Sequence, residues 1–226
     1  MLKQSKFAGR QPGFTLVELA IVLVIIGLIL AAVLKGQEMI INAKIKNVIN
    51  DLRGVSAAYY SYQDRYKAVP GDDAAASMHF ASGVIGNGNG IIEGLYTASA
   101  PPAAGTAESN SFWQHTRLSG FMTGAATDTS APPPSNALGG ILGVQGPATG
   151  TYGMTGNVVC SGSIPWKIAL AVDTVMDDGN SDTGTVRGGL TSAAANDPTT
   201  SGISHSYGVN PAPADTDATL TLCMRI

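Results

Sequence analysis

The chain has 226 residues and a formal net charge of −3, with 13 basic and 16 acidic side chains. Residues 35–67 carry six basic and three acidic residues, whereas residues 68–226 carry four basic and twelve acidic ones. An acidic C-terminal part lacks the basic surface through which proteins bind phosphates, so strong nucleic-acid binding is not indicated. The length suits one head domain with a stem, or two small lobes.

A long apolar run follows a short leader that contains Lys3, Lys6 and Arg10. From Phe14 to Leu34 there are 21 residues, and Glu18 is the only charged one. As a helix, this run would be roughly 31 Å long, close to the thickness of a bilayer's hydrocarbon core. A signal peptide fits poorly because the run is too long and lacks a small-X-small cleavage site after it, and a buried core helix is usually shorter. The run predicts a membrane-spanning helix.

Glu18 is the unusual residue of this run. A carboxylate in hydrocarbon costs a few kcal/mol, so an acid inside a membrane segment usually has a partner and a role. A cut between Gly13 and Phe14 would create an α-amino group one helical turn before Glu18, on the same chain or on a neighbouring one. The acid would then also lie in a first helical turn, where the helix dipole favours negative charge.

The sequence Gly13-Phe14-Thr15-Leu16-Val17-Glu18, between a basic leader and an apolar run, resembles the prepilin signature of type IV pilins and type II secretion pseudopilins. The resemblance implies that a prepilin peptidase cleaves after Gly13, removes the leader 1–13 and methylates Phe14. It implies that Glu18 guides docking into a helical fibre. Many pilins have a proline midway along the helix, where this chain has Lys35.

The resemblance also implies a location and a set of partners. The subunit would wait in the inner membrane as a single-pass protein and would then enter a surface pilus or a periplasmic pseudopilus. Its partners would be the prepilin peptidase, further copies of itself, other pilins and an inner-membrane assembly platform. Two stretches of the head resemble large pilin-like proteins: Val69-Pro70-Gly71-Asp72 with the later Asn-Gly repeat and Phe112–His115, and Asp177-Asp178-Gly179 with Thr183–Arg187.

The helix is predicted to continue beyond the membrane run. Apolar residues recur at alternating spacings of four and three, which makes one stripe on a helix: Ile41, Ile45, Val48, Leu52, Val55, Tyr59 and Tyr62. We expect one helix over about 14–66, which Val69-Pro70-Gly71 ends. Its part 14–34 would cross the membrane and form the fibre core, and its amphipathic part 35–66 would pack on a head, residues 67–226.

The head is predicted to be α+β, which agrees with the pilin fold: a long helix packed on a small antiparallel sheet. Asp72 is a candidate N-cap for a first short helix. Residues 123–151 are rich in proline and small residues and predict a long surface loop. The remaining expected elements are a helix at 109–118, a strand at 152–160, a helix or a strand from Ser163 or Pro165 to Met176, and an alternating strand at 219–226.

Cys160 and Cys223 are the only cysteines. In a chain exported past a membrane, an even pair predicts a disulfide, and two buried free thiols are the alternative. The resemblance agrees with a disulfide, since many type IV pilins join their C-terminal region in this way and major pseudopilins generally do not.

Two stretches could hold calcium, the one cofactor that the residue pattern suggests. The first contains Asp177, Asp178, Asn180 and Asp182; the second contains Asn87, Asn89 and Glu93, to which Asp72 and Asp73 could add. Turn formation by Asp and Asn is the alternative for both. The three histidines are scattered and no nucleophile elbow or phosphate loop is present, so no enzyme is predicted.

Three roles stay open at this stage. The chain could be the main subunit of a type IV pilus, a minor subunit at the tip with a binding or adhesion head, or a type II secretion pseudopilin. The cysteine pair counts against the last. The sequence does not choose among adhesion, motility, DNA uptake and secretion.

Overall fold

The computed structural model describes residues 13, 15–98, 108–125, 132–147, 150–190 and 219–226. The leader before Gly13 and the side chain of Phe14 lie outside these residues. The chain divides into two compact units, residues 1–42 and 43–226. The elements are α1 (Leu16–Tyr66), α2 (Ala76–His79), α3 (Glu108–Leu118), β1 (Leu142–Gln145), β2 (Val158–Pro165), α4 (Trp166–Met176), β3 (Val186–Leu190) and β4 (Thr219–Arg225). The predicted α+β class is confirmed.

Helix α1 is continuous over 51 residues, as the sequence predicts. It ends before Lys67, whose positive φ of 58° does not continue a right-handed helix. Pro70 follows and has no backbone N–H to donate to a further helical turn. The predicted apolar stripe is confirmed in the second unit. Its residues Val48, Leu52, Val55, Tyr59 and Tyr62 are buried, together with Ile49 and Ala58 of the same helix. Ile41, by contrast, is 49% exposed.

The sheet of the head has the strand order β1-β2-β4-β3, and every neighbouring pair is antiparallel. The C-terminal strand β4 is therefore an interior strand, and its Cys223 lies opposite Cys160 of β2. Both sulfurs form a disulfide, and both cysteines are fully buried. The tail strand and the disulfide expected from the sequence are thus present.

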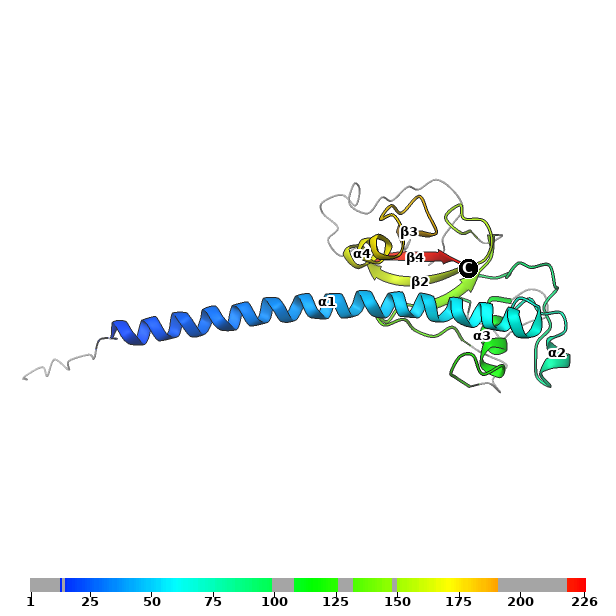
Figure 1. The fold of residues 1–226 in the computed structure, drawn as a ribbon, viewed down its shortest axis with the longest axis horizontal. Helices are drawn as coiled ribbons and strands as arrows, with labels where there is room; N and C mark the ends of the chain where they lie inside the picture. Colours follow the sequence, from blue (N-terminus) through cyan, green and yellow to red (C-terminus); the bar gives the residue numbers. More distant parts are fainter. Residues whose placement is uncertain (1–12, 14, 99–107, 126–131, 148–149, 191–218) are drawn as a thin grey trace, which may run out of the picture. The chain divides into compact units, whose positions relative to one another are not determined.

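One face of the sheet packs against helices α1, α3 and α4. Figure 1 shows the cyan part of α1 running alongside β2 and β4. Alternate residues of β4, Leu220, Leu222 and Met224, join this core. The core also contains Phe112 and Trp113 of α3.

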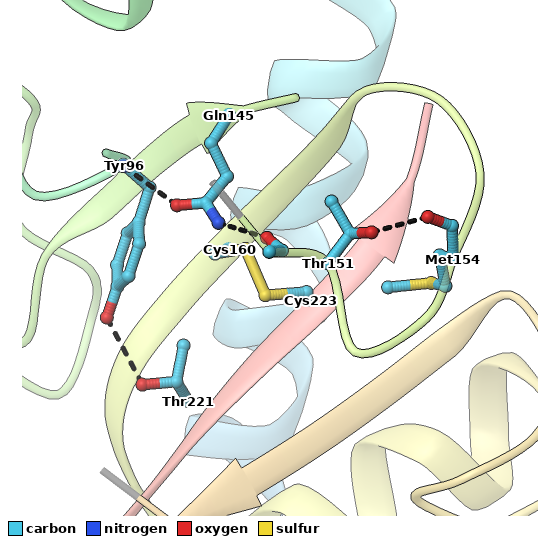
Figure 2. The surroundings of a disulfide bond; sticks show 8 residues. Tyr96, Gln145, Thr151, Met154, Cys160, Thr221 and Cys223 are labelled. Carbon is cyan, nitrogen blue, oxygen red and sulfur yellow. Dashed lines mark hydrogen bonds between the residues drawn. A yellow bond between two sulfur atoms is a disulfide. The ribbon is translucent and has the colours of Figure 1, made fainter. Parts of the chain in front are cut away.

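The other face of the sheet is covered as well. Tyr96 and Met154 pack there against the disulfide, and the hydroxyl groups of Tyr96 and Thr221 are hydrogen-bonded at 3.1 Å. Figure 2 shows these side chains around the two sulfurs. A Cβ at Gly143 would lie 2.0 Å from the carbonyl oxygen of Tyr96, so only glycine permits this close approach. Both faces of β4 are therefore buried, although its sequence alternates.

Three predictions for the head need correction. Strand β1 lies inside the stretch predicted as a loop, and β3 was not predicted at all. Both are short and contain glycine, so neither shows a clear period of two. Strand β2 begins at Val158 rather than at Tyr152, because positive φ angles at Tyr152, Gly153 and Gly156 form turns before it.

Two helix predictions have different outcomes. The stretch after Pro165 is helix α4 and not a strand, and Pro165 precedes its first residue. Asp72, however, does not cap a helix. Helix α2 has only four residues, and its N-cap is Ala75, without a side-chain hydrogen bond. The carboxylate of Asp72 instead accepts three backbone N–H groups of a distant loop, which compete with capping.

Candidate functional site

The start of α1 is closed by a reciprocal hydrogen-bond arrangement between Thr15 and Glu18. The backbone N–H and the hydroxyl of Thr15 both donate to Glu18 Oε2 at 2.8 Å. The backbone N–H of Glu18 donates to the Thr15 hydroxyl at 3.3 Å. This is a capping box, which satisfies orphan N–H groups at a helix start. Sequence reasoning overlooked it, although the Thr-X-X-Glu spacing of the signature contains the signal.

The capping box leaves part of the Glu18 carboxylate for another partner. Both hydrogen bonds that Thr15 donates, from its backbone N–H and from its hydroxyl, go to Oε2. Within the part of the chain that the structure describes, no hydrogen bond to Oε1 is present. The carboxylate is therefore positioned on the first turn, with one oxygen available to a donor from another chain.

The apolar residues of the first unit have no protein partner within the described chain. Leu16 is 87% exposed, Leu23 is 69% exposed and Leu34 is 66% exposed. Helix α1 is long and apolar enough to cross a membrane, and none of its most apolar window, with a mean hydropathy of 3.1, is buried. So large an apolar surface needs lipid or other protein to cover it.

In the head, Asp72 holds the glycine-rich loop that follows α2. Its Oδ1 accepts the backbone N–H of Gly88 at 2.6 Å and of Asn89 at 3.3 Å, and its Oδ2 accepts that of Gly90 at 2.5 Å. Asp72 is only 3% exposed. The structure thus brings Asp72 to the Asn-Gly repeat, as one of the two calcium hypotheses requires, but backbone donors occupy both carboxylate oxygens.

Glu108, the first residue of α3, lies beneath the same loop. Its carboxyl group accepts the backbone N–H of Asn87 at 3.0 Å and that of Glu93 at 3.2 Å, and the residue is fully buried. Burial, together with the hydrogen bond between the two glutamate side chains, raises the pKa of Glu108 to about 8. The same bond lowers the pKa of Glu93. No local pattern around Glu108 predicts this role, because its partners lie 15 and 21 positions away.

Glu108 should make the stability of the head depend on pH. A carboxyl group whose pKa is raised from 4.5 to about 8 by folding stabilises the folded state fully only below the lower value. This contribution is lost as the pH rises through the higher value. We expect the melting temperature of the wild type to fall between pH about 5 and about 9 more steeply than that of Glu108→Gln. Asp64→Asn, at an exposed site, is the matched control and should keep the wild-type slope.

The acidic turn after α4 is built around Asp177. Carboxylate oxygens of Asp173, Asp177 and Asp178 lie within 4.8 Å of one another. Asp177 Oδ2 accepts the backbone N–H groups of Thr185 and Val186, and Asp178 Oδ1 accepts that of Asn180 at 2.9 Å. These carboxylates act in turn formation. Asp182 lies on the same turn but outside this carboxylate group, which contains Asp173 instead. The side-chain oxygen of Asn180 accepts the backbone N–H of Asp182 at 3.2 Å.

Calcium binding at this turn stays a prediction, and calorimetry can test it. If Asp177 and Asp178 bind the ion, CaCl₂ should release heat and raise the melting temperature of the wild-type protein. Asp178→Asn should lose both effects, and Asp64→Asn should keep them. No heat and no thermal shift with the wild type would contradict the prediction.

The histidines that the structure describes have structural contacts. His115 is buried; its Nδ1 accepts the backbone N–H of Gly71 at 2.9 Å and its Nε2 donates to the carbonyl of Val84 at 2.7 Å. Burial lowers the pKa of His115, in agreement with a neutral ring. The Nδ1 of His79 lies 2.9 Å from Asp73 Oδ2. His205 lies outside the described residues.

Residues 9–34 match the prokaryotic N-terminal methylation motif. The match contains Gly13, Phe14 and Glu18 and covers the whole apolar run from Phe14 to Leu34. No curated protein and no solved structure matches the chain. The similarity to known proteins that was found therefore lies in the N-terminal segment, residues 9–34.

Proposed function

The prokaryotic N-terminal methylation motif is the signature of type IV pilins and pseudopilins, and from it we propose that the chain is a type IV pilin-like structural subunit. A prepilin peptidase cleaves it after Gly13 and methylates Phe14. The mature subunit stays in the inner membrane through α1 until an assembly platform polymerises it into a helical surface fibre.

The observation that carries this proposal is the coincidence of the motif with the start of α1. The motif covers residues 9–34 and the helix begins at Leu16, so the proposed cut between Gly13 and Phe14 would fall just before the helix. The capping box begins at Thr15, the residue after Phe14. The new N-terminus would therefore be followed at once by a first helical turn that is already hydrogen-bonded. A neighbouring subunit's Phe14 amine could then reach the remaining oxygen of Glu18 and set the axial register of the fibre.

In this proposal, burial of the exposed apolar residues stabilises the finished fibre, which lies in water. Apolar surface removed from water contributes about 25 cal/mol per Å². In the membrane the same residues are covered by lipid, so assembly exchanges lipid contacts for helix–helix contacts. Specific polar contacts such as the one at Glu18 then decide the geometry of the fibre.

The head permits two other roles for the same assembly class. A minor subunit at the fibre tip would use the head for binding or adhesion, and a pseudopilin would form a periplasmic fibre in type II secretion. The buried disulfide favours a pilin over a major pseudopilin. Mass spectrometry of sheared fibres distinguishes a major from a minor pilin subunit. A major subunit is the main protein of such fibres, and a minor subunit is rare in them.

Processing at Gly13 is the first step to test. Gly13→Leu should leave uncut precursor in the membrane fraction, visible on a gel as the larger band. Gly9→Leu, the same change in the leader away from the cut, should be processed normally. In the wild type, mass spectrometry should find an N-terminal methylated Phe14. Normal cutting of the Gly13 variant would contradict the proposal.

A further inference from the structure

The exposed loop Asn87-Gly88-Asn89-Gly90 contains two Asn-Gly pairs. Asn-Gly is chemically labile because glycine has no side chain to hinder its backbone nitrogen. That nitrogen loses its proton and attacks the Asn Cγ, the Cγ–Nδ2 bond breaks, and ammonia leaves. Water then opens the succinimide ring, and the products are Asp or isoaspartate. The reaction needs no reagent other than water.

In the folded head the attacking nitrogens are both hydrogen-bonded to one buried carboxylate. Gly88 and Gly90 donate their N–H groups to Asp72 at 2.6 and 2.5 Å. A negative charge next to an N–H group disfavours loss of its proton, and the hydrogen bond holds the nitrogen away from attack. The hydrogen bonds to Asp72 therefore oppose deamidation at its first step, the attack by the glycine nitrogen.

The attacked side chains are held as well. Asn87 Nδ2 donates to Glu93 at 3.2 Å, and Asn89 Nδ2 donates to Glu93 at 2.7 Å. Their carbonyl oxygens accept the backbone N–H groups of Asn89 and Ile91. Attack would require both amide groups to rotate out of these bonds.

We propose that Asn87–Gly90 is a spontaneous deamidation site that the folded head suppresses through Asp72, and that conversion of Asn89 prevents the loop from closing again. The second part follows from the contact to Glu93. Deamidation replaces the donor Nδ2 by a carboxylate oxygen, which places two negative charges where a hydrogen bond was. Asp72 adds a further carboxylate to the same loop. A loop that opens and reacts is then permanently changed, independently of how the subunit assembles.

The first experiment follows deamidation of the purified full-length protein in detergent at mildly alkaline pH, with peptide mass spectrometry over time. Loss of a hydrogen bond to a charged group corresponds to about a tenfold effect. Both Asn-Gly pairs should therefore react at least about tenfold more slowly in the folded protein than in the same protein in urea. Equal rates would overturn the proposal without any variant.

Two variants test the named contacts. Asp72→Asn should react about tenfold faster than the wild type in the folded state; Asp64→Asn, which removes an exposed charge, should react at the wild-type rate. A wild-type rate for Asp72→Asn would contradict suppression by this residue. Asn89→Asp should show faster hydrogen exchange at the Gly88 and Gly90 amides, whereas Asn47→Asp on α1 should not. Unchanged exchange in Asn89→Asp would contradict the permanent opening.

Discussion

Glu18→Ala should give processed, membrane-bound subunit but very few fibres. In the proposed assembly the carboxylate meets the Phe14 amine of a neighbour in an apolar surrounding. Removal of one partner of a buried ion pair typically costs about 3–5 kcal/mol, because the other charge stays unpaired. This cost recurs at every subunit contact, so we expect fibre yield to fall by at least about a hundredfold. Sheared fibres measured by immunoblot, against total membrane-bound subunit, give the ratio.

Two further variants separate the charge of Glu18 from its capping role. Glu18→Gln keeps a side chain that suits the capping box but has no charge. Thr15→Ala removes the hydroxyl of the box and keeps the carboxylate, at a typical cost of about 1 kcal/mol. If the charge guides docking, Glu18→Gln should fail like Glu18→Ala, and Thr15→Ala should keep most fibres. Normal fibre yield from Glu18→Gln would contradict this mechanism.

Loss of the disulfide should have the largest effect on the stability of the head. The bond joins residues separated by 63 positions, and a loop of that length restricts the unfolded chain by about 4 kcal/mol on the loop-entropy estimate. Cys160→Ala with Cys223→Ala should therefore lower the free energy of unfolding by about this amount. Urea denaturation of the purified protein, followed by tryptophan fluorescence, measures the difference.

The place of the disulfide in the sheet supports this expectation. It ties the interior strand β4 to β2, and Figure 2 shows Tyr96 and Met154 beside it. Each single variant should lose as much as the double variant, since either change removes the bond. Because both cysteines are fully buried, a reductant should open the bond in urea but not in native buffer. An unchanged unfolding midpoint in the double variant would contradict the prediction.

The long N-terminal helix was predictable because its signals are local. The length of the apolar run, the alternating four-and-three spacing beyond it and Pro70 determine where α1 lies, and the structure has that helix at Leu16–Tyr66. The period of two in the tail likewise predicted β4. Such patterns depend on residues a few positions apart, which a sequence shows directly.

Much of the structure of the head could not be predicted, because it depends on contacts between residues far apart in the sequence. Asp72 looks like a helix cap in the sequence, but the loop at Gly88 offers it three N–H groups, and no local pattern shows that competition. Strand β1 is too short and too rich in glycine to be recognised without β2 beside it.

The sequence by itself determined the long apolar helix and the N-terminal methylation motif, on which the proposed class of assembly rests, because both depend on consecutive residues. Only the tertiary structure decided which polar groups meet. Glu108 is buried against Glu93, and Asp72 holds the two Asn-Gly pairs. A hydrogen bond depends on the distance and the direction between donor and acceptor. For residues far apart in the sequence, only the folded chain determines both.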